Sequence, residues 1–391
     1  MSQLLNERWS ETKDALLEGL SGTRKSSMAV CLENTRRFLA ESATAGSTSA
    51  GNIATLNRVI LPIIRRVMPT VIANEIIGVQ PMTGPVAQIH TLRVRYADSG
   101  DGVVAGDEAL SPFKIAAAYS GNNVDSAPKA DTTAKMEGTP GKRMSIQILK
   151  TPVEAKSRKL SARWTFEAAQ DAQAQQGIDI EAEIMAALAQ EITAEIDQEI
   201  LASLRLLGTV EQTYDQSLVS GTATFVGDEH AALAIQINRV SNLIAQRTRR
   251  GAGNWAVVSN QALTILQSAT TSAFARTTEG TFEAPTNTKF VGTLNGAMRI
   301  YVDAYLSDTD NNNQVLVGYK GASEADAAAF YCPYIPLMSS GVVLDPATFE
   351  PVVGFLTRYG YVELSNTASS LGNAADYLGK VAIISDNVSF K

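Results

Sequence analysis

The chain has 391 residues, which is too long for one small domain and comfortable for two. Apolar residues make up 45% and charged residues 19%, as in an ordinary soluble globular protein. The formal net charge of −7 argues against a surface that reads nucleic acid, because such surfaces are normally basic.

Cysteine usage and the N-terminus bear on the compartment. Cys31 and Cys332 lie far apart and form no metal-binding or redox spacing, which argues against a zinc site or a disulfide framework. The N-terminus carries acids and Trp9 where a signal peptide needs a basic start and an apolar run. The apolar run at 59–64 is too short to span a bilayer. We therefore expect a soluble, intracellular chain.

The first 52 residues predict an arm followed by a linker. Apolar residues at roughly helical spacing predict a helix within residues 2–40, and ESATAGSTSAGN at 41–52 has the composition of a flexible linker. Such an arm either docks on its own chain as a helical extension or packs on a neighbouring subunit or a scaffold.

Residues 58–96 predict a bent helical segment and then a strand. Pro62 and Pro69 disfavour one continuous helix within 58–77. In the strand that follows, Leu92, Val94 and Tyr96 alternate with Arg93 and Arg95. The pattern predicts a sheet with one buried face and one cationic face.

Residues 97–143 are rich in Gly, Ala, Ser, Asp and Asn and show no helical period, and a strand at 144–150 follows them. A loop this long is uncommon inside a compact domain. We interpret it as an extended, partly β segment whose partners lie on another chain.

The strongest helix signal covers about residues 179–207. Isoleucine or leucine recurs there every four residues, at Ile180, Ile184, Leu188, Ile192, Ile196, Ile200 and Leu204. A four-residue repeat advances about 40° per step on a 3.6-residue helix, so the apolar stripe winds around it. We expect a helix on the order of 40 Å long that ends near Gly208 and contacts different partners along its length.

An acidic stripe follows the same helix at Glu191, Glu195 and Glu199, and no Lys or Arg occurs between residues 163 and 205. Each like-charge pair costs about 0.2–0.5 kcal/mol in an isolated helix. The stripe is either a solvated acidic face or is compensated by basic groups of the same or a neighbouring subunit. The candidates for such contacts between subunits are Arg65, Arg66, Arg93 and Arg95.

From about residue 230 the pattern predicts an α+β domain. A helix at 230–250 ends in a cationic last turn, which suits the negative end of the helix dipole. Residues 254–258 predict a buried strand, and Ser259 or Asn260 can cap the helix that follows. After a polar loop at 269–289, strand-like segments occur at 298–305, 314–320, 327–338 and 352–364.

A search for catalytic motifs finds no HExxH, GxSxG, P-loop or GxGxxG pattern. The run DTDNNN at 308–313 lacks the glycine and closing glutamate of a calcium loop, so we interpret it as a turn. His90 and His230 are the two histidines, and we interpret both as structural. We expect no enzymatic activity, no metal and no cofactor.

Three blocks, in one order along the chain, resemble a known family. They are LPIIRRVMPTVIANEIIGVQPMTGPVAQIHTLRVRY at 61–96, VEAKSRKLSARWTFEAAQDAQAQQGIDIEAEI at 153–184, and a block from GTLNGAMRIYVDAY to DPATFEPVVGFLTRYGY at 292–361. Together they resemble the major capsid proteins of T4-like tailed phages. The resemblance implies the α+β HK97 capsid fold, with an N-terminal arm, an extended loop, a peripheral domain with a long spine helix, and an axial domain.

The ranges that correspond to these parts follow from the blocks. We expect the arm at 1–55, the peripheral domain at 56–95 and 152–225, the extended loop at 96–151, the axial domain at 226–354 and a return to the peripheral domain at 355–391. The loop is too short to hold the domain that T4-like capsid proteins insert there. The family is often trimmed after a Leu/Ile-x-Glu motif, and Leu39, Ala40 and Glu41 fit it. Glu41 is therefore the candidate cleavage position for a prohead protease; the alternative is an uncut arm.

The resemblance implies a major capsid protein that assembles as hexamers and pentamers into an icosahedral head shell, in the host cytoplasm, and remains in the virion. It would enclose double-stranded DNA without sequence-specific binding and without a membrane, beside other capsid and decoration proteins, a portal and a scaffold. Mild acidity suits a wall that must not adhere to the polyanion inside it. Three alternatives stay open: a vertex subunit that forms only pentamers, an encapsulin-like nanocompartment shell with an enzyme cargo, and a soluble enzyme whose site the motifs miss.

Overall fold

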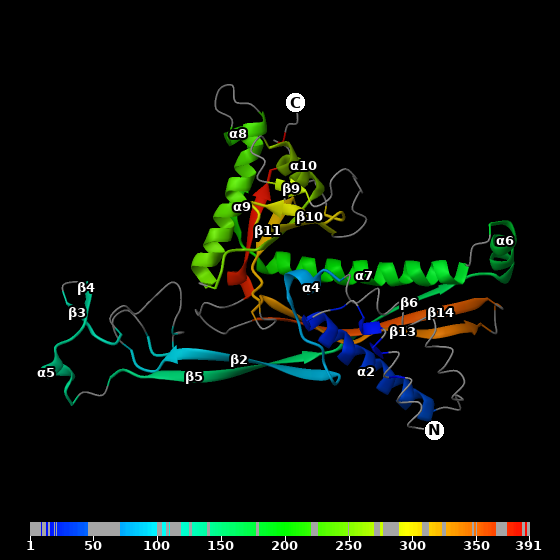
Figure 1. Ribbon diagram of the computed structural model, residues 1–391, viewed down its shortest axis with the longest axis horizontal. Coiled ribbons are helices and arrows are strands. Elements are labelled where there is room, and N and C mark those ends of the chain that lie inside the picture. Colours follow the sequence, from blue (N-terminus) through cyan, green and yellow to red (C-terminus); the bar gives the residue numbers. More distant parts are fainter. Residues whose placement is uncertain are drawn as a thin grey trace. The chain divides into compact units, whose positions relative to one another are not determined.

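The protein is seen in a computed structural model as two compact units, each built from segments distant in the sequence (Figure 1). The first unit comprises residues 1–87, 153–204 and 322–362, and the second comprises residues 88–152, 205–321 and 363–391. The structure describes residues 9, 13–14, 16–18, 20, 22–45, 71–99, 104–106, 109, 119–124, 127–138, 141–176, 180–219, 226–248, 250–269, 274–276, 289–306, 313–322, 326–345, 348, 350–364, 374–384 and 388.

A four-stranded sheet organises the first unit. Its order is β1 (Gly78–Val79), β13 (Ala329–Leu344), β14 (Pro351–Glu363) and β6 (Lys156–Arg163). β1 is parallel to β13, and β14 is antiparallel to β6. Most of β14 alternates between buried and half-buried side chains, which is the pattern of a strand with one packed face. The packed face is the one that meets the helices of this unit.

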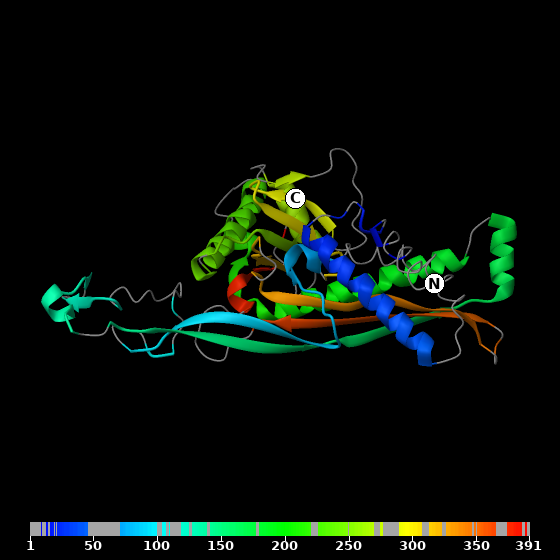
Figure 2. The same ribbon diagram turned by 60° about the horizontal axis from the view of Figure 1, so that its bottom comes forward.

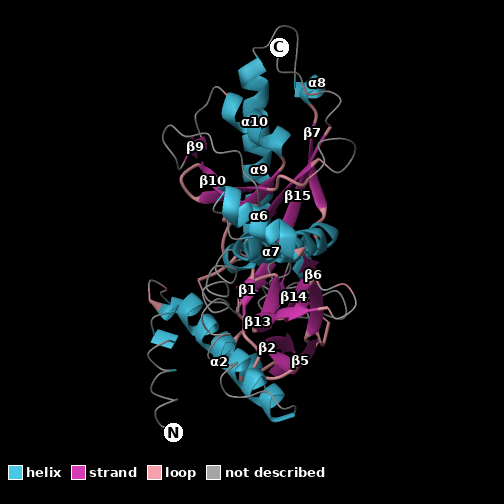
Figure 3. Ribbon diagram, turned by 90° about the vertical axis from the view of Figure 1, so that its right-hand side faces the viewer, coloured by secondary structure: helices cyan, strands magenta, loops and turns pink. Residues whose placement is uncertain are grey.

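The long helix α7 (Ile180–Leu207) lies along that face of the sheet (Figures 1 and 3). Its predicted winding stripe is confirmed: Ile192, Ile196 and Ile200 are buried, whereas Ile180 and the other early stripe residues are half-buried. The buried carboxylate of Asp197 accepts a hydrogen bond from the Ile72 backbone N–H at 2.9 Å. This bond ties the segment that carries the short helix α4 (Ala73–Ile76) to α7.

Helix α2 (Gly22–Ala45) docks the described part of the N-terminal arm on its own chain. It packs against β13 (Figure 2). This contact buries Met28 and Cys31. Asn34 Nδ2 donates hydrogen bonds to the carbonyl oxygens of Met82 at 2.7 Å and Tyr334 at 3.0 Å. The sequence predicts a linker from residue 41, and this is wrong for 41–45, which continue the helix. Glutamate and alanine favour a helix once one is already formed before them.

A seven-stranded sheet organises the second unit. Its order is β7 (Val210–Tyr214), β15 (Leu378–Ile383), β12 (Gln314–Gly318), β8 (Trp255–Val258), β11 (Met298–Val302), β10 (Lys289–Leu294) and β9 (Phe274–Arg276). β8 is parallel to β11, and β12 is antiparallel to β8 and β15. All four residues of β8 are buried, because an interior strand covered on both faces carries apolar residues at every position.

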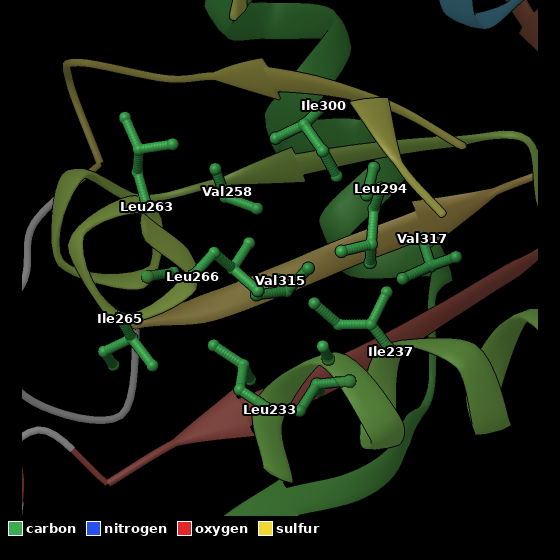
Figure 4. Close-up of a cluster of buried hydrophobic side chains, with 14 of the residues drawn as sticks. Leu233, Ile237, Val258, Leu263, Ile265, Leu266, Leu294, Ile300, Val315 and Val317 are labelled. Carbon is green, nitrogen blue, oxygen red and sulfur yellow. The ribbon is translucent and has the colours of Figure 1, made fainter. Parts of the chain in front are cut away.

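Helices α9 (Val226–Thr248) and α10 (Asn260–Ser268) complete the core of this sheet. Apolar side chains of both helices meet those of the strands, among them Leu233, Ile237, Leu263, Leu266, Val315 and Val317 (Figure 4). Ser259 caps α10, since its Oγ accepts a hydrogen bond from the Ala262 N–H at 3.1 Å. The sequence prediction of a buried strand followed by a capped helix is confirmed, and of the two candidate caps, Ser259 and Asn260, the structure has Ser259.

Most of a long two-stranded ribbon also belongs to the second unit. β2 (Val86–Tyr96) pairs with β5 (Met144–Glu154), and the two strands run in opposite directions (Figures 1 and 2). The Ala97 N–H donates to the Arg143 carbonyl at 2.9 Å beyond the strand ends. Between them lie a small pair, β3 (Asn122–Val124) and β4 (Ala127–Lys129), and one turn of helix, α5 (Thr133–Met136). For the described residues, the prediction of an extended, partly β segment is confirmed.

Three short elements complete the described chain: α6 (Phe166–Gln176) in the first unit, and α8 (Gln216–Val219) and a 3-10 turn (Ala374–Tyr377) in the second. β13 pairs in the first unit's sheet, and β15 lies inside the seven-stranded sheet. The residue ranges expected for the arm, the extended loop and the peripheral and axial domains stay a prediction. The period of a single strand does not reveal its partner, and pairing between distant strands decides both cases.

The contact between Gly318 and Trp255 gives a test of the second unit's core. A β-carbon on Gly318 would collide with the buried indole of Trp255 on the neighbouring strand. We expect Gly318→Ala to lower the free energy of unfolding by about 1–3 kcal/mol through overpacking, measured by denaturant unfolding of the purified chain. Gly141→Ala, where a β-carbon meets open space, is the control and should change stability by no more than about 0.5 kcal/mol. Equal effects of the two variants would contradict this packing.

Candidate functional site: an arginine network and two exposed apolar surfaces

An arginine network joins the sheet of the first unit to helix α7. Arg158 on β6 donates from Nε to the Tyr359 hydroxyl at 2.6 Å, from Nη1 to Glu195 Oε2 at 2.7 Å and from Nη2 to Glu199 Oε2 at 2.5 Å. The Tyr359 hydroxyl on β14 donates in turn to Glu199. One guanidinium therefore binds two carboxylates of the helix and one phenol of the sheet.

Strand register explains how these groups meet. In the antiparallel pair of β14 and β6, Thr357 lies opposite Arg158 and Tyr359 lies opposite Lys156. Arg158, Leu160 and Ala162 alternate with more exposed neighbours, so they lie on the face that α7 covers. On the helix, Glu195 and Glu199 are one turn apart and share a side.

The network shifts the acidity of its members. Burial would raise the pKa of Glu199, but hydrogen bonds from Tyr359 and Arg158 outweigh it and hold that pKa below its ordinary value. Burial and the hydrogen bond to Glu199 raise the pKa of Tyr359. Burial would lower the pKa of Arg158, but its bonds to Glu199 and Tyr359 raise it. The shifts favour a charged Arg158 and Glu199 beside a protonated Tyr359 hydroxyl.

The acidic stripe of α7 is thus compensated mainly from within the chain. Sequence reasoning missed Arg158, because it looked for cations inside the helix and at more distant positions. The alternation of KSRKLSAR around Arg158 is the signal that could have placed it on the helix-facing side. Glu191 is exposed, and the described residues make no hydrogen bond or ion pair to it.

Of the four predicted basic partners, only Arg95 has a described side chain, and no contact joins it to this network among the described residues. Arg65 and Arg66 lie outside the described residues, as does the side chain of Arg93. Arg95 lies half-buried on β2, in the second unit. Their role as contacts between subunits stays a prediction.

A row of apolar side chains on β5 is exposed to solvent and is not covered by the described part of the chain. Met144, Ile146 and Ile148 are 53%, 68% and 60% exposed. They alternate with the polar Ser145 and Gln147, which is the pattern of a strand with one buried face. We call this row the ridge. Sequence reasoning found the strand, but not that its apolar face is exposed.

A second apolar surface lies at the end of β13, where Val342, Val343 and Leu344 are 43%, 56% and 51% exposed. We call these three residues the tip. Just before them, Gly341 has a φ of +71°, and the Ser340 hydroxyl accepts a hydrogen bond from the Gly354 N–H at 2.9 Å. The side chain stands in for a backbone partner, as happens where a strand bulges. Sequence reasoning did not single out the tip.

The remaining sequence-predicted positions lie on separate elements. His90 is exposed on β2, whereas His230 is buried in α9 with its Nδ1 2.5 Å from the Ser268 Oγ. Glu41 lies within α2, and its side chain is outside the described part. Among the described residues, no group of three or more His, Cys, Asp or Glu side chains could hold a metal ion. Within those same ranges, no helix has both the length and the apolar character needed to cross a bilayer.

Comparison with known proteins gives consistent matches over most of the chain. The family model "Major capsid protein Gp23" matches residues 53–383. The chain is 29% identical to the major capsid protein of Vibrio phage KVP40, over 85% of this chain and 81% of that protein. It is 29% identical to the major capsid protein of Enterobacteria phage T4 (83% and 78%) and 30% identical to that of Salmonella phage ViI (82% and 80%).

Solved structures also align with most of the chain, at lower identity. The capsid of Myoviridae phage XM1 aligns with a TM-score of 0.44 and 10% identity, over 79% of this chain and 90% of that one. A chain of Mycobacterium phage Bobi aligns with a TM-score of 0.46 and 13% identity, over 80% and 89%.

The Tyr359 hydroxyl provides a test of the network. Tyr359→Phe keeps the ring that packs on Tyr331, with ring centroids 5.5 Å apart, but removes both hydrogen bonds of the hydroxyl. We expect a loss of about 1–3 kcal/mol of unfolding free energy at pH 7. A depressed carboxylate pKa stabilises the fold above the unfolded pKa of about 4.3, and this contribution is lost as the pH falls through the folded value. The difference between the two proteins should therefore shrink below about pH 4.

Urea unfolding at several pH values measures this difference. Tyr334→Phe is the matched control, because no hydrogen bond of its hydroxyl occurs among the described contacts, and it should stay within about 0.5 kcal/mol of the parent at every pH. A Tyr359→Phe effect that does not change with pH would contradict the role given to Glu199.

Proposed function

The chain belongs to the Gp23 family of major capsid proteins, and from this premise we propose that its copies assemble as hexamers and pentamers around double-stranded DNA in a tailed phage. Its function is to form the shell of the phage head, and it is a structural component of the virion. The observation that carries this conclusion is the family match, which spans residues 53–383.

The interior of such a shell holds a polyanion, and the net charge of this chain suits it. A formal charge of −7 limits adhesion between wall and genome, so DNA would be held by confinement and not by specific contacts. A closed lattice sums many interfaces of modest strength, so the subunit needs extensive surface for its own copies.

The parts of the HK97 arrangement map onto the two units as a proposal. The four-stranded sheet with α7 would be the peripheral domain with its spine helix, and the seven-stranded sheet would be the axial domain. The β2–β5 ribbon with the segment between its strands would be the extended loop. A length of about 40 Å for α7 supports its part as the spine, and the exposed ridge supports contacts of the ribbon with neighbouring copies.

Charged contacts between copies would add to these surfaces. We place them at Glu191, at the outer sides of Glu195 and Glu199, and at the basic residues Arg65, Arg66, Arg93 and Arg95. Glu191 supports this best, because it is exposed and has no partner among the described residues. Other capsid and decoration proteins, a portal and a scaffold would be the remaining partners.

Sedimentation of the native source tests the function. We expect this chain to be the dominant protein of a megadalton particle that contains DNA, shown by gradient fractionation, intact mass and nucleic-acid content. A few copies per particle would instead indicate a vertex subunit, and a DNA-free particle with an enzyme inside would indicate a nanocompartment. The intact mass also shows whether the chain is cut after Glu41.

Charge reversal at Glu191 tests the proposed charged contact. We expect Glu191→Lys to reduce the yield of shells severalfold while circular dichroism and unfolding of the subunit stay unchanged, because the side chain is exposed and makes no described contact within the chain. Glu167→Lys, an identical change at an exposed position of α6, is the control and should leave the yield unchanged. Normal yield from Glu191→Lys would remove this residue from the interface.

A further inference from the structure

We propose that four residues at one end of the β2–β5 ribbon act as a clasp, which holds the two strands in register there and opens without unfolding either sheet. They are Tyr96, Asp98, Tyr119 and Arg143. The end that they close is the one nearer β3, β4 and α5, and we call it the far end (Figure 1). The inference concerns the folded chain by itself, so it goes beyond the proposed function and does not depend on it.

The clasp is a closed ring of hydrogen bonds. The Asp98 N–H donates to the Tyr119 hydroxyl at 3.3 Å, and that hydroxyl donates to the Arg143 carbonyl at 2.5 Å. The Arg143 N–H donates back to Asp98 Oδ2 at 2.8 Å, and the Arg143 guanidinium pairs with the same carboxylate at 3.3 Å. The backbone and side-chain bonds from Arg143 lower the pKa of Asp98, so this carboxylate is charged at neutral pH. One hydroxyl and one carboxylate therefore join the ends of the two strands.

A small apolar core of its own supports the clasp. Tyr96, Ala109 and Tyr119 are buried together, Val94 packs against them, and the rings of Tyr96 and Tyr119 have centroids 4.5 Å apart. The N–H groups of Gly106 and Ala109 donate to the carbonyls of Tyr96 and Val94, each at 2.8 Å. All members of this small core come from β2 and from the segment between β2 and β5. It can therefore open without disturbing the core of either sheet.

The two strands of the ribbon keep one register from end to end. At the near end the Ala155 N–H donates to the Pro85 carbonyl at 2.9 Å, and at the far end the Ala97 N–H donates to the Arg143 carbonyl at 2.9 Å. From 85 to 97 and from 143 to 155, twelve positions separate these bonds on each strand. Both bonds therefore belong to the same antiparallel register.

This register decides which face of the ribbon carries the ridge. Ile146 lies opposite Val94 and so shares its face, which on β2 is the face that the small core covers. A slip of one residue would turn the ridge to the other face. A two-stranded ribbon is only marginally stable in water, so its far half would fray or slip without further contacts. The clasp supplies these contacts, because its ring closes only when Arg143 lies opposite Ala97.

Chymotrypsin digestion of the purified full-length chain tests whether the clasp opens by itself. Tyr119 is 6% exposed, so cleavage after it requires opening, and the cleavage rate follows the population of the open form when opening is fast. Tyr119→Phe keeps an aromatic cleavage site and the packed ring but removes both hydrogen bonds of the hydroxyl. We expect cleavage after residue 119 to be about tenfold faster than in the parent, while the midpoint of urea unfolding stays unchanged.

Two control variants separate opening of the clasp from unfolding of a core. Tyr334→Phe makes the same chemical change on β13 and should leave cleavage after residue 119 at the parent rate. Gly318→Ala weakens the core of the seven-stranded sheet and should also leave that rate unchanged. Equal acceleration in Gly318→Ala and Tyr119→Phe would mean that residue 119 becomes accessible only when the core unfolds, which would overturn the proposal. The parent rate in Tyr119→Phe would overturn it as well.

Hydrogen exchange along the ribbon tests whether the clasp holds the strand ends. In Tyr119→Phe we expect exchange of the amides in 94–97 and 143–147 to be about fivefold faster or more, because the far end is released. Exchange in 86–89 and 151–154, beside the near end, should match the parent. Acceleration at both ends, or at neither, would contradict a clasp that acts on the far end alone.

Asp98→Asn tests whether the ring acts as one unit. The amide keeps the size of the side chain but removes the charge that pairs with the Arg143 guanidinium. We expect faster cleavage after residue 119 in this variant. Combined with Tyr119→Phe, it should be cleaved little faster than the faster single variant, because either change breaks the same ring. Single effects that multiply in the double variant would show two independent contacts and would overturn the ring.

Discussion

Burial of the winding apolar stripe of α7 against the four-stranded sheet is the constraint on which the first unit depends. The stripe rotates about 40° per step, so the sheet can cover it only along part of the helix, and burial is most complete between Ile192 and Leu204. Arg158 lies at the margin of that contact and binds Glu195 and Glu199 from the strand side. The packing brings the ion pairs together, and the ion pairs help to orient α7 on the sheet. Burial of apolar side chains supplies most of the free energy that stabilises this contact.

A shell protein must keep part of its apolar surface uncovered until its copies meet. The two units here satisfy their own cores, with Trp255 and the side chains around it buried, and yet leave the ridge and the tip exposed. Burial of apolar surface drives folding, and it would then also drive assembly, because the folded subunit leaves apolar surface exposed. The exposed charge of Lys150 beside the ridge disfavours indiscriminate association through it.

Most of the candidate site was only partly predictable from the sequence. The acidic stripe of α7 was visible because its spacing is local, but its partner Arg158 came from a strand that lies more than 30 residues away. The ridge could be predicted as one face of a strand, since alternation is local, whereas its exposure depends on what other segments cover. The only sequence signal for the tip is a short apolar run before Asp345. That run does not indicate that the strand ends there with its apolar side chains exposed.

The sequence by itself determined the family, the α+β class, the long helix, a cap at Ser259 or Asn260 and the extended, partly β segment, because periodicity, capping and family blocks are properties of neighbouring residues. Only the tertiary structure decided which sheet received β13 and β15, which cation met the stripe, and which apolar faces stayed open. These outcomes depend on which distant segments pair with or cover one another. Backbone hydrogen bonds between strands do not depend on side-chain identity, so the sequence of one strand does not specify its partner.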